Sequence, residues 1–200
     1  RGAAVDKQSS NGSTARMCAA LKGHERVGDL LLRRGAEFNQ QNSSGGTALM
    51  LAGRHGHERV VELLLRYGAK VDLQDSDGDT ALMGAALYGH ERVVDLLLRH
   101  SAKLDPQSNN GATALMAAAQ GGRERVVDLL IRRGAEVNLQ SSNGFTALMH
   151  AALLNRPAVV RRLLWTGADT AARSASGKTA LQLAKEEGCA ECVHVIEEHA

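Results

Sequence analysis

The sequence predicts an all-α solenoid, built from stacked helix-turn-helix units that are joined by short hairpin-like turns. One observation is a recurrence every 33 residues, which is typical of repeat architectures. It is clearest in the threonines at Thr14, Thr47, Thr80, Thr113, Thr146 and Thr179. A glycine lies two positions before each of these threonines, and an alanine follows each of them. A second observation is the aromatic content of only 2%, which indicates a thin, layered core of aliphatic side chains.

Each unit is expected to form two short helices, and the third unit shows the pattern well. Its first helix is predicted over residues 81–87, with Thr80 as the N-cap, because a threonine hydroxyl can accept from a free N–H of the first turn. Gly89 is expected to end this helix, since glycine enters the left-handed region at little cost. The second helix is predicted to begin near Glu91. Its apolar residues have the spacing of one buried helix face and are Val93, Val94, Leu96, Leu97 and Leu98.

No single unit of this kind can bury its two helices alone, so neighbouring units must stack. The repeated pattern resembles the ankyrin repeat. The residues that carry the resemblance are Gly68-Ala69, Asp75-x-x-Gly78-x-Thr80-Ala81-Leu82-Met83-x-Ala85-Ala86-x-x-Gly89-His90 and Val93-Val94-x-Leu96-Leu97-Leu98. The resemblance implies a single ankyrin-repeat domain over residues 9–200, after the tail of a preceding repeat over residues 1–8. The implied repeats are 9–41, 42–74, 75–107, 108–140, 141–173 and 174–200.

Some columns of the repeat depart from the family pattern. The chain has Thr-Ala-Leu-Met where the family has Thr-Pro-Leu-His, so methionine is expected to replace a hydrogen-bonding histidine with apolar volume. Arg16 stands in the column of Leu49, and a polar residue in a core column indicates solvent on that side. We therefore expect Arg16 to belong to an N-terminal cap. The same argument predicts a solvent-facing C-terminal cap from Gln182, Lys185 and Glu197.

Composition and charge argue against several classes of function. The formal net charge is +2, which gives no electrostatic basis for a nucleic-acid or anionic-membrane partner. No stretch approaches the roughly 18 apolar residues of a membrane span. Three cysteines do not make a disulfide framework, and they favour a reducing, intracellular compartment such as cytoplasm or nucleus. We expect a monomer. Arginines near the ends of the second helices leave a nucleic-acid track as an alternative.

Two motifs resemble catalytic or cofactor sites but are better explained by the repeat. Ser176-Gly177-Lys178-Thr179 resembles half of a phosphate-binding loop, yet Ala172 stands where such a loop needs a glycine. Every unit has a glycine two residues before its threonine, so the motif is explained as the turn that recurs in each repeat. A histidine follows the glycine between the helices at His24, His57 and His90, where it is expected to cap or stabilise the loop. We therefore predict no catalytic residues and no cofactor.

The cysteine pair Cys189-x-x-Cys192, with His194 and His199 nearby, raises the question of a zinc site. A single pair of this kind is a weak signal without a second pair of ligands. Cys192 also stands in the column of Val93, which is a core column. The sequence therefore predicts no metal site, and Cys192 is interpreted as a structural residue.

Specificity is expected in the columns that vary between units, which are the turn residues around each glycine and the ends of the first helices. The resemblance implies that these columns line the concave face that grips a partner. The candidate partner-binding residues are Arg54, His55, Asp77, Asp79, Leu87, Tyr88, Asn110, Gln120, Asn143, Phe145, Leu153 and Leu154. The aromatic and leucine side chains among them are candidate anchors, and Gln120 with Gly121 is expected to leave room for the partner. The alternative is that the three leucines only complete the packing between neighbouring first helices.

These observations predict a non-catalytic module that binds another protein or peptide. An alternative is a regulatory or targeting segment of a larger enzyme whose catalytic domain lies elsewhere. Another is a nucleic-acid or small-ligand binder, which a salt-dependent affinity for RNA or DNA would reveal. A further alternative is an engineered binder, although the irregular caps argue against it.

Overall fold

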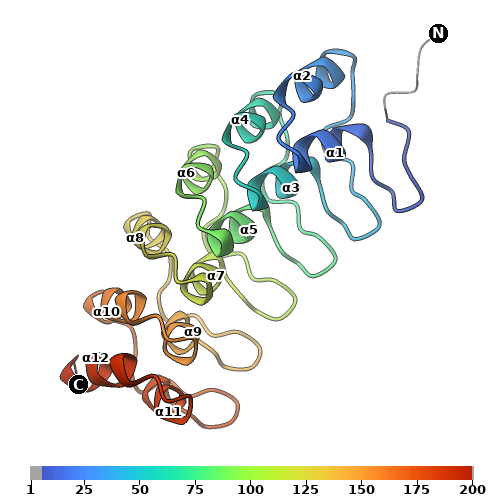
Figure 1. Cartoon of the computed structure of the whole chain (residues 1–200). Coiled ribbons are helices and arrows are strands. Elements are labelled where there is room, and N and C mark those ends of the chain that lie inside the picture. Colours follow the sequence, from blue (N-terminus) through green and yellow to red (C-terminus); the bar gives the residue numbers. More distant parts are fainter. Residues whose placement is uncertain (1–5, 200) are drawn as a thin grey trace. The chain divides into compact units, whose positions relative to one another are not determined.

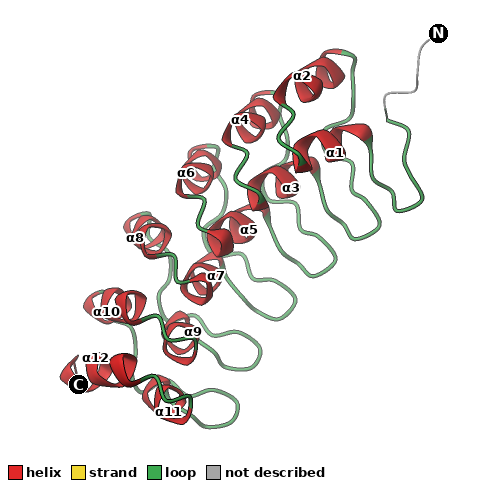
Figure 2. Ribbon diagram, viewed as in Figure 1, coloured by secondary structure: helices red, strands yellow, loops and turns green. Residues whose placement is uncertain are grey.

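The computed structural model describes residues 6–199, and this part of the chain contains twelve α-helices and no strand (Figure 1, Figure 2). Odd-numbered helices are the first helices of the units, and even-numbered helices are the second. The first helices are α1 (Ala15–Leu21), α3 (Ala48–Arg54), α5 (Ala81–Tyr88), α7 (Ala114–Gly121), α9 (Ala147–Leu153) and α11 (Ala180–Glu186). The second helices are α2 (Glu25–Arg33), α4 (Glu58–Arg66), α6 (Glu91–Arg99), α8 (Glu124–Arg132), α10 (Pro157–Trp165) and α12 (Ala190–His199). The predicted all-α solenoid of helix-turn-helix units is confirmed.

The helices begin where the sequence predicted, because threonine caps the first helices. Thr80 Oγ1 accepts from Met83 N at 3.3 Å, and Thr113 Oγ1 accepts from Met116 N at the same distance. Gly89 has φ +83°, so the residue after α5 is left-handed as expected. Ser101 and Asn155 take positive φ without being glycine. Asparagine tolerates this conformation better than most residues, which explains its use at position 155.

The contacts divide the chain into two compact units, which are described separately. Unit 1 comprises residues 6–85 and 92–103 of the described chain, and unit 2 comprises residues 86–91 and 104–199. Within unit 2, α9 packs between α7 and α11, and α10 packs between α8 and α12. The first and second helices therefore form two separate layers in this unit.

The core between the layers is aliphatic, as the composition predicted. In unit 2, the largest fully buried side chains include Leu115, Met116, Leu130 and Leu148. Met149 is 1% exposed. The expectation that methionine fills a core column with apolar volume is thus confirmed. Burial of aliphatic side chains of this size contributes roughly 1.5–3 kcal/mol each relative to exposure.

A ladder of side-chain hydrogen bonds connects successive repeats through one column of Asp and Asn. In unit 2, Asp105 accepts from the backbone N–H of Glu136 at 3.3 Å, and Asn138 Oδ1 accepts from that of Asp169 at 2.9 Å. In unit 1, the same bond runs from the N–H of Lys70 to Asn39. Each of these bonds joins residues 31 positions apart, so the side chain of one repeat satisfies the backbone of the next.

The turns stack through glycines that a larger residue could not replace. Gly144 has φ +75°, and a Cβ added there would lie 2.9 Å from Ala175 N in the next turn. That same Ala175 N–H donates to Asn143 O at 2.8 Å. Gly177 has φ +77°, but no atom lies within 4 Å of the corresponding position. The left-handed conformation is therefore shared by both turns, whereas the close approach occurs only at Gly144.

The residues that precede α4 and α8 connect these helices to the repeat before them. His57 Nε2 lies 3.0 Å from Leu21 O, and Arg123 Nε donates to Leu87 O at 3.0 Å. The side chains of His24 and His57 make no hydrogen bond that caps their own helices. Of the two roles expected for these histidines, capping does not occur at His24 or His57. Instead, His57 stabilises its loop by reaching the end of the preceding first helix.

The terminal repeats show one expected cap and one error. Gln182, Lys185 and Glu197 are exposed, as predicted, and Lys185 pairs with Glu197 at 2.7 Å. Arg16, however, is only 1% exposed, so the prediction that solvent reaches this side chain is wrong. Its guanidinium lies 4.0 Å from the Asp6 carboxylate. Burial lowers the pKa of Arg16, an effect that the charges of Asp6 and Glu37 oppose.

None of the helices within residues 6–199 is both long enough and apolar enough to cross a membrane.

Candidate partner-binding surface

All twelve candidate residues are at least partly exposed in the structure. Four of them belong to unit 1: Arg54, His55, Asp77 and Asp79. The other eight belong to unit 2 and define what we call the second-unit surface: Leu87, Tyr88, Asn110, Gln120, Asn143, Phe145, Leu153 and Leu154. This surface combines the turns that precede α7 and α9 with the ends of α5, α7 and α9 (Figure 1).

The helix ends of the second-unit surface carry its exposed apolar groups. Tyr88 is 41% exposed and Leu154 is 40% exposed. Tyr88 also stacks on His90, with ring centroids 6.5 Å apart, which restrains the tyrosine ring. Leu87 and Leu153 are half-buried. Packing within the fold therefore buries part of the Leu87 and Leu153 side chains. Tyr88 and Leu154 are the more exposed apolar groups at these helix ends.

Gly121 does not leave room for a partner, so that expectation is wrong. A Cβ at this position would lie 2.2 Å from Leu87 O. The carbonyl at the end of α5 therefore fills the space beside the glycine, and Arg123 Nε donates to the same oxygen. Gln120, one residue earlier, is exposed. Position 121 must be small for the repeats to pack, while position 120 faces outward.

Phe145 lies against His150 of α9, with ring centroids 5.3 Å apart and the rings tilted by 52°. Burial lowers the pKa of His150, so the imidazole is held neutral at physiological pH. Phe145 is itself half-buried. The two rings therefore form an uncharged aromatic contact between the turn and α9.

The two asparagines of the surface form hydrogen bonds within their own turns. Asn110 Oδ1 accepts from Ser108 Oγ at 2.6 Å, and Asn143 Oδ1 accepts from Ser141 Oγ at the same distance. Asparagine side chains commonly stabilise turns in this way. The turns also join each other, because Ser142 N donates to Asn110 O at 2.8 Å. The structure thus brings the two predicted turn residues together on stacked turns.

In unit 1, the candidates include an acidic turn. The backbone N–H groups of Asp77 and Asp79 donate to Asp75 Oδ1 at 3.0 and 2.9 Å. The pKa of Asp79 is raised, chiefly by burial and further by the Asp75 and Asp77 carboxylates, while Arg54 opposes the shift. His55 stacks on His57, with ring centroids 6.1 Å apart. These four candidates differ in character from the apolar second-unit surface.

The cysteine pair is buried rather than arranged around a metal. Cys189 is 6% exposed and Cys192 is fully buried. Burial raises the pKa of the Cys192 thiol to about 11. Across the part of the chain that the structure describes, no three His, Cys, Asp or Glu side chains are grouped so that they could hold a metal ion. Cys189 Sγ lies 3.8 Å from Leu153 O. Cys189 stands in the same repeat column as Arg123, which donates to Leu87 O.

Comparison with known proteins identifies the family. The family model described as "Ankyrin repeats (3 copies)" matches residues 1–75, 65–141 and 126–200. The chain belongs to the ankyrin-repeat family. The crystal structure of the human ASB11 ankyrin repeat domain is similar to the whole of this chain, with a TM-score of 0.91 and 28% identity, over 88% of that domain's chain. No curated protein matches.

Ankyrin repeats are generally modules for protein–protein interaction, and the family is typically non-catalytic. Their extended surfaces of stacked turns and helices suit binding, because each repeat adds a similar strip to one face. The second-unit surface has this construction.

The most exposed large apolar side chain among residues 6–199 is not one of the predicted binding residues. Trp165, at the end of α10, is 68% exposed and is the chain's single tryptophan. The signal was present in the repeat, since Arg33, Arg66, Arg99 and Arg132 occupy the same column. This column lies outside the turns and first helices that the family resemblance implied for partner binding.

Proposed function

We propose that this chain binds a partner protein or peptide without catalysing a reaction, and that it does so through the second-unit surface. The observation that carries the proposal is the exposure of Tyr88 and Leu154 at the ends of two first helices. The hydrogen bonds that join the repeats at these helix ends use backbone carbonyls, as at Leu87 and Leu153. The exposed side chains are therefore not needed for these ties.

The composition of the surface suits a protein interface. Tyrosine is among the residues that most often dominate binding energy, and such anchors lie within a ring of polar contacts. Here Tyr88 and Leu154 supply apolar area, while Gln120 supplies a polar side chain on α7 between them. Stacked turns and half-buried neighbours hold these groups in place before binding, which reduces the ordering cost of association. The resemblance to ankyrin repeats implies that these columns line a concave face, and we propose that the partner binds there.

The test begins with a partner identified by affinity purification with the whole chain as bait. Tyr88→Ala and Leu154→Ala are then compared with the parent by isothermal titration calorimetry. Removal of a large anchor commonly costs about 2 kcal/mol or more, which is roughly thirtyfold in Kd. We expect each variant to lose at least about tenfold in affinity while its helical circular dichroism stays unchanged.

Arg125→Ala is the matched control, because Arg125 is exposed at the start of α8 in the same unit. It should bind within about twofold of the parent. The proposal is wrong if both anchor variants bind like the parent while Arg125→Ala is impaired. A partner that proves to be RNA or DNA, with an affinity that falls steeply with salt, would also overturn it.

We also propose that one copy of the chain forms the binding unit and that it works inside the cell. The free, buried thiols Cys189 and Cys192 suit a compartment in which cysteines stay reduced. Sedimentation velocity of the purified chain should give a single monomeric species. Cell fractionation should recover the full-length protein in the cytosolic or nuclear fraction. A membrane-impermeant reagent applied to intact cells should not label it, and labelling would contradict this location.

A further inference from the structure

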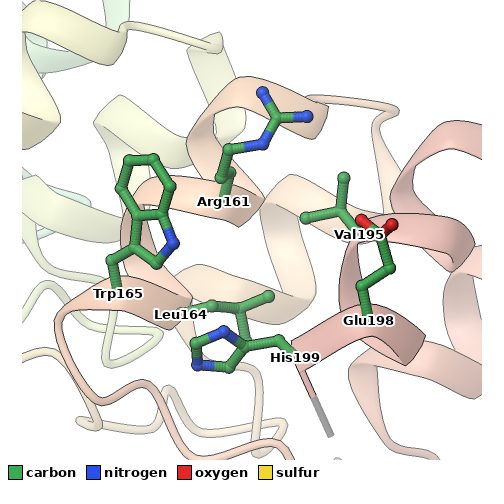
Figure 3. Close-up of a pocket in the computed structure, with 6 residues that line it drawn as sticks. All are labelled: Arg161, Leu164, Trp165, Val195, Glu198 and His199. Atoms are coloured by element: carbon green, nitrogen blue, oxygen red, sulfur yellow. The ribbon is translucent and has the colours of Figure 1, made fainter.

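A pocket lies between the second helices α10 and α12 of unit 2, away from the turns of the second-unit surface. Its volume is about 240 Å³, and its lining consists of Arg161, Leu164, Trp165, Val195, Glu198 and His199. Figure 3 shows Arg161 and Trp165 on one side and Val195 with Glu198 on the other. Leu164 is 2% exposed and Val195 is 6% exposed, so these two form an apolar floor. Pockets for drug-sized ligands are usually larger, and this one suits a single side chain.

The two α10 residues of the pocket break a surface pattern that the preceding second helices keep. The column of Trp165 is arginine in the four preceding second helices, and the column of Arg161 is Asp or Glu in the same four. On two of these helices the two columns form a surface ion pair, between Arg33 and Asp29 at 2.9 Å and between Arg99 and Asp95 at 2.6 Å. On α10 a cation has replaced the anion and an indole has replaced the cation.

Neither replacement is required by the helix or by the core. Trp165 is 68% exposed, so most of the indole gains nothing from burial in this chain. The arginines of the same column show that a solvated residue is sufficient there. A large indole held beside an apolar floor resembles the anchor pockets of protein interfaces, where aromatic residues dominate the binding energy.

The charges around the pocket indicate what the bound group must carry. Arg161 is exposed and, among the described residues, makes no ion pair. The Glu198 carboxylate lies 3.2 Å from His194 Nε2, one turn earlier on α12. Among residues 6–199 the guanidinium of Arg161 therefore has no ion-pair partner, and a carboxylate suits it because the two can form paired hydrogen bonds. Glu198 retains lone pairs that could accept from a peptide N–H.

We propose that this pocket is a second docking site, separate from the second-unit surface, for a short peptide segment of a partner protein. The segment carries a large apolar side chain that covers Trp165 and fills the pocket above Leu164 and Val195. An aspartate or glutamate beside that side chain pairs with Arg161. The site would let the chain hold one partner on its turns and another, or a second part of the same one, on its outer helices.

The experiment uses a displayed library of random twelve-residue peptides, selected on the whole chain. Selected peptides should share a large apolar residue within about two positions of an acidic residue. Because Trp165 is the only tryptophan, its fluorescence should shift to shorter wavelength when a selected peptide binds, and acrylamide should quench it less. A peptide in which Gln or Asn replaces the acidic residue should bind at least about tenfold more weakly.

Two variants restore the residues of the other second helices and so are expected to fold. Trp165→Arg should weaken binding of a dye-labelled selected peptide by at least about thirtyfold. Arg161→Asp should remove the preference for the acidic peptide over its amide form. Arg132→Ala, in the same column on α8, is the control and should bind within about twofold of the parent. If Trp165→Arg does not fold, the fluorescence shift and quenching of the parent remain as the test.

Several results would overturn the proposal. No enriched peptide, equal binding to the parent and to Trp165→Arg, or equal binding of the acidic and amide peptides would each do so. A fluorescence shift that grows with chain concentration alone, with dimers in sedimentation, would show that a second copy occupies the pocket. Loss of peptide binding in Tyr88→Ala and Leu154→Ala, but not in Trp165→Arg, would place the peptide on the second-unit surface and leave the proposed function standing.

Discussion

The stacked turns of unit 2 allow the cost of a close approach to be measured apart from the cost of a backbone conformation. Gly144 and Gly177 stand in the same column and have φ of +75° and +77°. Alanine at either position must adopt the left-handed region, which costs about 1–2 kcal/mol. Only at Gly144 would the new Cβ meet another turn, whose backbone would lie 2.9–3.0 Å away, whereas no atom lies within 4 Å of it at Gly177.

The expected magnitudes follow from this difference. Gly144→Ala forces the backbone of Ser174 and Ala175 away, since contacts under about 3.0 Å are not tolerated. Such overpacking costs about 1–3 kcal/mol, and it stretches the 2.8 Å hydrogen bond from Ala175 N to Asn143 O. Gly144→Ala should therefore lose about 2–5 kcal/mol of unfolding free energy. Gly177→Ala should lose only about 1–2 kcal/mol.

Urea unfolding, followed by Trp165 fluorescence and by circular dichroism, measures both variants, because all three positions lie in unit 2. The midpoint should fall further for Gly144→Ala, with an unchanged slope. In thermal unfolding, each kcal/mol should lower Tm by about 2–4 °C for a chain of this size. Equal losses in the two variants would refute the reasoning, because the left-handed backbone alone would then account for the glycine.

Two further predictions concern titratable groups. Burial lowers the pKa of His150 in the folded chain, so the unfolded chain binds more protons once pH falls below about 6.5, and stability should decline from there downward. Unfolding free energies of the parent and of His150→Gln, measured between pH 7.5 and 5, should diverge as pH falls, and parallel curves would contradict the assignment. The pKa of Cys192 is raised to about 11, so this buried thiol should resist iodoacetamide at pH 8 while the exposed Cys18 reacts. Cys192→Val should change stability by less than about 1 kcal/mol, and either rapid alkylation of Cys192 or stoichiometric zinc in the purified chain would show the structural interpretation to be mistaken.

Much of the fold could be predicted because local chemistry repeats at a fixed spacing. Thr113 supplies a hydroxyl that caps the start of α7, and glycine adopts the left-handed turns at the lowest cost. Helix starts therefore followed from residue type and spacing alone. The core could also be predicted, since apolar residues such as Met116 and Leu130 recur at the spacing of one helix face, and that face is buried between stacked helices.

The errors arose where a residue's role depends on a distant group. Arg16 was expected to face solvent, but its burial near Asp6 is set by tertiary packing. Gly121 reads as empty space in the sequence, whereas the carbonyl of Leu87 occupies that space. Trp165 was overlooked because a solvated column has no effect on secondary structure. Its exposure, and the floor beneath it, become apparent only when α10 and α12 are packed together.

The Asp and Asn ladder also determines how far a local disturbance travels along the repeats. If the repeat that holds Asp105 opens, the N–H of Glu136 in the next repeat loses its acceptor. These bonds are exposed to solvent, so the loss of one acceptor costs only the net worth of a hydrogen bond, about 0.5–1.5 kcal/mol. A repeat therefore opens more easily when the repeat that follows it is already open. Fraying should therefore advance from repeat to repeat in order. A partner that clamps one turn of unit 2 would then slow hydrogen exchange at amides it never touches, such as that of Asp169, whose acceptor is Asn138.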